Sequence, residues 1–119
     1  FIQHGAAHGL TADQGPIEEM RRAFDERRQV MSEGLRAIEG VTLAEPTGAF
    51  YAFPNVKVFG ATSGEVADYL LKEHAIATVN GAVFGEGGEG YLRIAYSCST
   101  EECERGVDRL AGALEKLRG

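Results

Sequence analysis

The sequence has few residues of several types, and each shortage argues against some classes of protein. It contains no tryptophan, three prolines and two cysteines among 119 residues. Two cysteines do not build a disulfide framework, so Cys98 and Cys103 are expected to be free thiols in a reducing cytoplasm. A metal site would require further ligands near this pair, and the sequence places none at useful spacing. We therefore expect no bound metal.

Long apolar runs and an excess of positive charge are also missing. No stretch reaches the length that spans a bilayer, and no secretory signal pattern opens the chain. The net charge of −6 argues against a nucleic-acid-binding protein, which needs a basic surface. The content of 44% hydrophobic and 25% charged residues is typical of a globular domain. We expect a cytoplasmic protein without nucleic-acid or membrane partners.

Helix and strand patterns alternate along most of the chain. Pro16 is suited to open a long helix, which is predicted over residues 15–39. Two capping boxes, beginning at Thr62 and Ser99, predict two further helices. Strands are predicted at residues 41–43, 49–53, 75–79 and 91–97. This order predicts an α+β fold in which helices cover one face of a small sheet of about four strands.

Each predicted helix has an apolar stripe that is expected to face the core. The stripe of the first helix contains Ile17, Met20, Phe24, Met31, Leu35 and Ile38. The stripe of the second contains Val66, Leu70 and Leu71, and that of the third Cys103, Val107, Leu110, Leu114 and Leu117.

Residues 1–13 differ from the rest of the chain. They are small, apolar and nearly uncharged, and their glycines make them a poor helix in isolation. The chain also begins with Phe1 and not with methionine. We expect residues 1–13 to be an appendage that packs on a missing part of a longer protein, and residues 14–119 to form one domain.

Arg93 lies in the middle of a strand that otherwise resembles a buried one. Leu92, Ile94 and Tyr96 alternate onto one apolar face, and Arg93 falls on the other. A half-buried cation needs a partner. That partner is either an Asp or Glu of this chain or the carboxylate or phosphate of a ligand, which a guanidinium binds with two parallel hydrogen bonds.

Other motifs favour simple structural roles. Residues 85–90 fit G-x-G-x-x-G, but a strand follows them where a nucleotide site needs a helix, so we predict a flexible loop. His4 and His8 have helical spacing without a third metal ligand. Neither Lys57, Lys72 nor Lys116 has the apolar setting that activates a lysine for Schiff-base chemistry.

Several blocks together resemble the class I/II pyridoxal-phosphate aminotransferases. They are residues 48–54 (GAFYAFP), residues 84–97 (FGEGGEGYLRIAYS), the helix from Ser99 with Glu104 and Arg109, and residues 3–7 (QHGAA). They occur in the family's order and spacing over nearly the whole chain.

The resemblance implies the C-terminal small domain of an aspartate-aminotransferase-like enzyme of fold type I. It implies that Arg93 binds the substrate α-carboxylate, that Phe50 borders the substrate pocket, and that the helix over residues 15–39 connects the two domains. The substrates would be an amino acid and a 2-oxo acid, the cofactor pyridoxal 5′-phosphate, and the assembly a homodimer. Residues 1–13 would pack on the large cofactor domain. The Schiff-base lysine would lie outside this chain, so we predict that the chain contains no catalytic residue and is inactive alone.

Two alternatives stay open at the level of sequence. The first is a pyridoxal-phosphate-dependent lyase or synthase on the same scaffold, which would share the carboxylate-binding arginine. The second is a stand-alone binding domain that has kept the fold without the chemistry.

Overall fold

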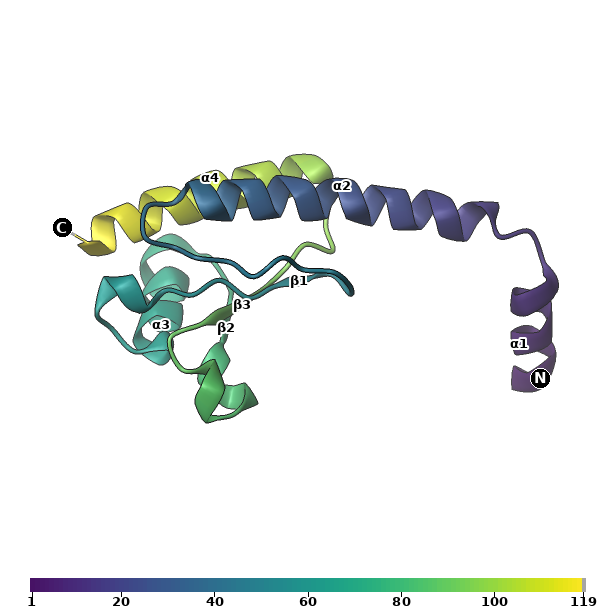
Figure 1. The fold of residues 1–119 in the computed structure, drawn as a ribbon, viewed down its shortest axis with the longest axis horizontal. Coiled ribbons are helices and arrows are strands. Elements are labelled where there is room, and N and C mark those ends of the chain that lie inside the picture. The colour runs from purple at the N-terminus through teal and green to yellow at the C-terminus, as the bar shows by residue number, and fades with distance from the viewer. Residues whose placement is uncertain (119) are drawn as a thin grey trace.

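A computed structural model describes residues 1–118 and confirms an α+β fold (Figure 1). Gly119, the last residue of the predicted domain, lies outside the described residues. The helices and strands are α1 (Ile2–Thr11), α2 (Gly15–Ala37), β1 (Tyr51–Ala52), α3 (Ser63–His74), β2 (Val79–Asn80), β3 (Leu92–Ala95) and α4 (Thr100–Arg118). Three short 3₁₀ turns are η1 (Lys57–Phe59), η2 (Gly81–Phe84) and η3 (Glu86–Gly88).

The sheet of residues 1–118 has three antiparallel strands in the order β1-β3-β2. Tyr51 is paired with Ala95, and Val79 with Arg93. The predicted strand at residues 41–43 is reduced to a single bridge between Thr42 and Asn55. Its first residue is used in ending α2, because the Val41 N–H donates to the Ile38 carbonyl at 3.1 Å.

The predicted strand at residues 75–79 is also shorter than expected. Ala75 adopts a left-handed conformation with φ 51° and closes α3, since its N–H donates to the Leu71 carbonyl at 3.1 Å. Pairing therefore begins only at Val79. Both predicted capping boxes are present, one between Thr62 and Glu65 and the other between Ser99 and Glu102.

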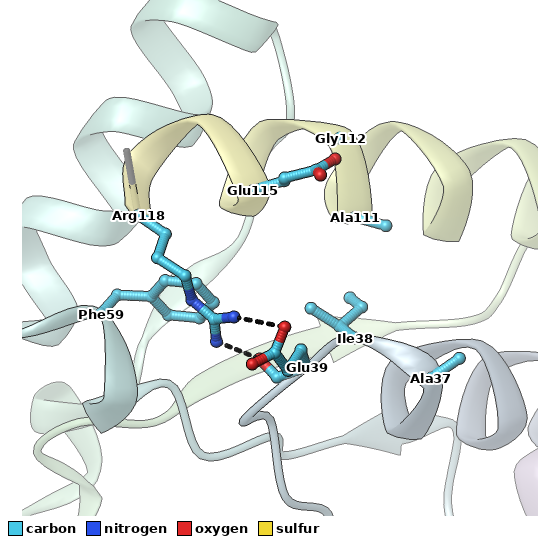
Figure 2. Close-up of a pocket in the computed structure, with 8 residues that line it drawn as sticks. All are labelled: Ala37, Ile38, Glu39, Phe59, Ala111, Gly112, Glu115 and Arg118. Atoms are coloured by element: carbon cyan, nitrogen blue, oxygen red, sulfur yellow. Dashed lines mark hydrogen bonds and ion pairs between the residues drawn. The ribbon is translucent and has the colours of Figure 1, made fainter.

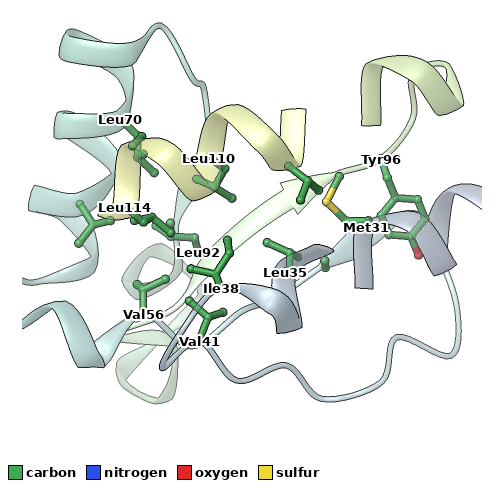
Figure 3. Close-up of a cluster of buried hydrophobic side chains, with 14 of the residues drawn as sticks. Met31, Leu35, Ile38, Val41, Val56, Leu70, Leu92, Tyr96, Leu110 and Leu114 are labelled. Atoms are coloured by element: carbon green, nitrogen blue, oxygen red, sulfur yellow. The ribbon is translucent and has the colours of Figure 1, made fainter. Parts of the chain in front are cut away.

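Helices α2, α3 and α4 bury their apolar faces in one core against the Leu92 face of the sheet (Figure 3). Three expected core positions are wrong. Leu71 is 53% exposed because it lies about 100° around α3 from the buried Leu70. Ile17 and Met20 are exposed because the first half of α2 extends beyond α4 (Figure 1). The core consists of Met31, Leu35, Ile38, Val41, Ala52, Val56, Val66, Leu70, Leu92, Tyr96, Cys103, Val107, Leu110, Ala113 and Leu114.

Helices α2 and α4 lie side by side and are in close contact at Gly34 (Figure 1). A Cβ added to Gly34 would clash with the Cγ1 of Val107. The missing side chain therefore lets the two helices approach closely along the top of the core.

Helix α1 lies apart from the rest of the described chain (Figure 1). It contains no buried residue, and the side chains of Phe1 and Leu10 are almost completely exposed. None of the helices in residues 1–118 is both long enough and apolar enough to cross a membrane.

Candidate functional site

The guanidinium of Arg93 lies between two aromatic rings beside the sheet. Its Cζ is 4.5 Å from the centroid of the Tyr51 ring and 4.9 Å from that of the Phe84 ring. Such cation–π contacts stabilise by about 0.5–2 kcal/mol each. Tyr51 belongs to β1 and Phe84 ends η2, directly after β2. Since β3 lies between β1 and β2, the two rings reach Arg93 from the two neighbours of the central strand.

Within residues 1–118, no Asp or Glu oxygen lies within 4.0 Å of the Arg93 guanidinium. The sequence left two partners open for Arg93, an acidic residue of this chain or an acidic group of a ligand. The described residues do not supply the first. Aromatic faces attract a guanidinium without using its N–H donors. The hydrogen-bonding edge of Arg93 is therefore left without a carboxylate from the described residues.

The glycine-rich segment that positions Phe84, predicted as a flexible loop, connects β2 to β3 through a folded backbone. It forms η2 and η3, and Gly81 and Gly88 pack so closely that a Cβ on either would clash with the carbonyl oxygen of the other. The Gly81 N–H donates to the Tyr91 carbonyl at 2.9 Å, and the Tyr91 N–H to the Gly88 carbonyl at 3.1 Å. Glycine is needed at both positions because the backbones of Gly81 and Gly88 meet where a side chain would not fit.

A polar cluster fastens this segment to the start of α3. The Ser63 N–H donates to Glu89 Oε1 at 2.8 Å, and the Asn80 Oδ1 accepts from the Ala82 N–H at 2.9 Å. The Ser63 backbone and hydroxyl bonds hold the pKa of the Glu89 carboxyl below its usual value. The carboxylate also lies at the N-terminus of α3, where negative charge is favoured.

The aromatic surface continues beyond Arg93 on the same side of the sheet. Phe53 stacks on Tyr91 with centroids 5.2 Å apart and packs against Phe84 in a T-shaped arrangement with centroids 6.2 Å apart. The Nζ of Lys57 lies 5.1 Å from the centroid of the Tyr91 ring. Of these rings, Phe84 contacts Arg93 together with Tyr51, and Phe53 and Tyr91 extend the aromatic surface from Phe84.

Phe50, the second residue predicted for the site, contacts the Tyr51 ring, which in turn contacts Arg93. Its ring centroid lies 5.9 Å from that of Phe24 of α2, on which it stacks, and 4.6 Å from that of Tyr51. Tyr51 is the residue that contacts Arg93 directly, and the sequence reasoning missed it. The pairing register of β1 and β3 explains this contact. Tyr51 is paired with Ala95, and Ala95 lies two residues after Arg93, on the same side of β3.

A second arginine shows a contrasting arrangement at the far end of α4 (Figure 2). Arg118 Cζ lies 5.5 Å from the centroid of the Phe59 ring, and Nη1 is 3.0 Å from Glu39 Oε2. These residues line a pocket of about 250 Å³ together with Ile38. The guanidinium of Arg118 already has its carboxylate, so this pocket is a weaker candidate for an anion site than the surroundings of Arg93.

The described residues do not fit a covalent site for pyridoxal phosphate, which requires an activated lysine. Lys72 forms an ion pair with Asp68 at 2.7 Å, and this bond raises the lysine pKa, opposite to the change that Schiff-base chemistry needs. Lys57 is held against Tyr91, and Lys116 is exposed on α4. Residues 1–118 also contain no group of three or more His, Cys, Asp or Glu side chains able to hold a metal.

Comparisons with known proteins agree on one family. The family model described as aminotransferase class I and II matches residues 1–110. An aspartate aminotransferase of Pyrococcus abyssi is 39% identical over 120 residues, covering 99% of this chain and 31% of that relative. The solved aromatic aminotransferase of Pyrococcus horikoshii superposes with a TM-score of 0.90 at 37% identity, covering 97% of this chain and 31% of that one.

A third match was solved together with a small molecule. The aspartate aminotransferase of Thermus thermophilus, solved with maleate, has a TM-score of 0.76 at 30% identity and covers 84% of this chain and 25% of that one. The chain thus spans about a third of the length of the relatives that it matches. On the sequence blocks, the fold and these matches, the chain belongs to the class I and II aminotransferase family.

Proposed function

We propose that this chain is the C-terminal, substrate-binding part of a pyridoxal-phosphate-dependent aminotransferase, which moves an amino group between an amino acid and a 2-oxo acid. Arg93 binds the α-carboxylate that both substrates carry. The observation that supports this role is a half-buried guanidinium, held by two rings, with no carboxylate partner among residues 1–118.

The chemistry of this arrangement suits a planar carboxylate. A guanidinium offers two parallel N–H bonds to a carboxylate, and hydrogen bonds to charged groups contribute about 1.5–3 kcal/mol each. Arg93 lies on the central strand of the sheet, so its backbone is fixed before substrate arrives. Binding then costs little reorganisation, and the substrate is oriented from its carboxylate end.

The names of the relatives support the assignment of Arg93 to a group that all the substrates share. They include aminotransferases named for aspartate and for aromatic amino acids, whose side chains differ in charge and size. The Thermus thermophilus enzyme was solved with maleate, which carries two carboxylates. The α-carboxylate is common to every amino acid, so a single arginine can serve enzymes of different side-chain preference.

In this proposal the rest of a longer protein supplies what the chain does not offer. That part holds the pyridoxal phosphate and its Schiff-base lysine, and the long α2 connects it to the small domain. The exposed Phe1, with Leu10 of α1 and Ile17 and Met20 of α2, packs against it. The whole protein is a homodimer in the cytoplasm, where the free thiols of Cys98 and Cys103 remain reduced.

Phe50 borders the substrate pocket in the same proposal. Its side chain is 38% exposed, and its packing on Phe24 of α2 and on Tyr51 supports a fixed position at the edge of the sheet. It would exclude water and contact the substrate, while Arg93 holds the carboxylate.

The test is the steady-state kinetics of the full-length enzyme with Arg93→Ala and Arg93→Lys. Loss of the guanidinium should raise KM and lower kcat/KM for every amino acid substrate. Lysine at this position should restore only part of kcat/KM, because its ammonium group lacks the two parallel N–H bonds of the planar guanidinium. Arg118→Ala is the control, since its guanidinium is also stacked on a ring but pairs with Glu39. Unchanged kcat/KM in Arg93→Ala would overturn the assignment.

Product analysis tests the reaction class. An aminotransferase forms one 2-oxo acid from each amino acid consumed and transfers the nitrogen to a second 2-oxo acid, whereas release of ammonia or sulfide would indicate a lyase. The 119-residue chain alone is expected to form no 2-oxo acid in a single-turnover assay. Formation of 2-oxo acid by the chain alone would contradict the proposal that the rest of a longer protein holds the cofactor and its lysine.

A further inference from the structure

We propose that Tyr51 and Phe84 are positioning residues that fix the plane of the Arg93 guanidinium so that its N–H edge faces the substrate carboxylate. This inference rests on the proposed function and adds a named cause for the orientation of Arg93. Neither ring needs to touch the substrate for this role.

The geometry points to the two rings because they approach Arg93 from different sides. Tyr51 reaches it from β1 at 4.5 Å, and Phe84 from the turn after β2 at 4.9 Å. An arginine side chain has several rotatable bonds, so an unsupported guanidinium samples many planes. Two rings within 5 Å of the Arg93 Cζ restrict those planes and bring no carboxylate oxygen to the N–H donors.

The rings are themselves held in place. Tyr51 pairs through its backbone with Ala95, and its ring contacts Phe50 at 4.6 Å. Phe84 is 54% exposed, yet its ring packs against that of Phe53 in a T-shaped arrangement with centroids 6.2 Å apart. The turn that carries Phe84 is fastened to α3 through Asn80 and Glu89. A rigid support of this kind is what a fixed guanidinium plane requires.

Arg118 shows why rings serve Arg93 better than an internal carboxylate would. Arg118 lies over the Phe59 ring, and both its Nη1 and its Nη2 are bound to Glu39, so these donors are occupied (Figure 2). A carboxylate of the chain beside Arg93 would hold the guanidinium equally well, but it would compete with the substrate for the same N–H groups. Aromatic faces hold the cation and do not compete.

The experiment compares leucine variants of the two positions in the full-length enzyme with variants that keep a ring. Tyr51→Leu and Phe84→Leu remove a cation–π contact each, and Tyr51→Phe and Phe84→Tyr are the matched controls. We measure kcat and KM for an amino acid substrate, and the competitive inhibition constant of propanoate, a carboxylate without an amino group. Each leucine variant should raise KM and the propanoate constant together, by roughly 3- to 30-fold, with kcat changed far less. The controls should stay within about twofold of the wild type, less than the smallest effect expected for a lost ring.

The Arg93→Ala variant distinguishes failure of the proposed function from failure of the positioning role of the two rings. If Arg93→Ala leaves KM unchanged, the proposed function fails. If Arg93→Ala raises KM and the propanoate constant while both leucine variants leave them unchanged, only the positioning role fails. A leucine variant that lowers kcat without raising the propanoate constant would also overturn it, since that is the signature of a structural defect.

A spectroscopic readout is independent of activity. The rings should shift the proton resonance of the Arg93 Nε–H upfield by ring currents in the wild-type full-length protein, and Phe84→Leu should reduce the shift. An unshifted Arg93 resonance in the wild type would contradict the positioning role. This measurement keeps the proposal falsifiable if Tyr51→Leu fails to fold.

Discussion

The backbone N–H of Ser63 donates to Glu89 Oε1 at 2.8 Å, across 26 residues of sequence. The hydroxyl of Ser63 lies 2.9 Å from the second carboxylate oxygen of Glu89 and 2.6 Å from Asn80 Oδ1. These bonds connect the start of α3 to both ends of the glycine-rich segment. Through that segment they determine where Phe84 meets Arg93.

Replacing Glu89 with Gln should lower the Tm and weaken its dependence on pH. The Ser63 bonds hold the pKa of the Glu89 carboxyl below its usual value. The stability from this carboxylate is therefore fully present above its unfolded pKa of about 4.3 and is lost as pH falls through the lower folded pKa. Calorimetric scans from neutral to acidic pH check this prediction. Glu86→Gln makes the same change of charge without these bonds, and its Tm should stay close to that of the wild type.

Substituting Gly34 with Ala should destabilise the packing of α2 on α4. The added Cβ clashes with Val107 Cγ1, and overpacking of this kind costs about 1–3 kcal/mol. Gly106→Ala on α4 is the matched control, because nothing lies within 4 Å of its Cβ position. That change should stabilise by about 0.5–1 kcal/mol through helix propensity. Urea unfolding of both variants gives the comparison, and equal effects would contradict the close approach.

Neighbouring leucines on α3 should respond differently to truncation. Leu70 is fully buried in the core, so Leu70→Ala should lower the free energy of unfolding by about 2–5 kcal/mol. Leu71→Ala should change it by less than about 1 kcal/mol, because that side chain is 53% exposed. A larger loss for Leu71 than for Leu70, measured by denaturant unfolding, would show that α3 packs with a different face inward.

The two thiols should differ in reactivity although their sulfurs are 3.5 Å apart. Burial is the main cause that raises the pKa of Cys103 to about 12, and this side chain is only 1% exposed. Iodoacetamide at pH 8 should therefore modify the half-buried Cys98 well before Cys103, because only the thiolate reacts. Peptide mass spectrometry of the native protein gives the order, and faster labelling of Cys103 would contradict its placement.

The sequence was sufficient for the features that depend on local chemistry. The two capping boxes, the long helix after Pro16 and the alternation around Arg93 are each set by residues close together in the chain. Features that depend on distant partners were harder to predict. The shortened strands follow from how α2 and α3 end, and the exposure of Ile17 follows from the absence of a neighbouring helix at that end of α2 in the described chain.

The candidate site shows the same division. Arg93 was identifiable because a charge in an apolar strand is costly without a partner. Tyr51 and Phe84 were not assigned, because their meeting with Arg93 depends on the order β1-β3-β2 and on the folding of the glycine-rich segment. Neither the strand order nor the contact between Gly81 and Gly88 is encoded in a local pattern.

The binding of 2-methylalanine to the full-length enzyme tests whether Arg93 holds the substrate carboxylate. This amino acid has no α-proton, so its dissociation constant reports only the steps that precede α-proton removal, and isothermal titration calorimetry measures it. Removing one partner of a desolvated charge pair costs about 2–5 kcal/mol, so Arg93→Ala should raise the Kd roughly 30-fold or more. A Kd equal to that of the wild type would show that another residue holds the carboxylate and would contradict the role of Arg93.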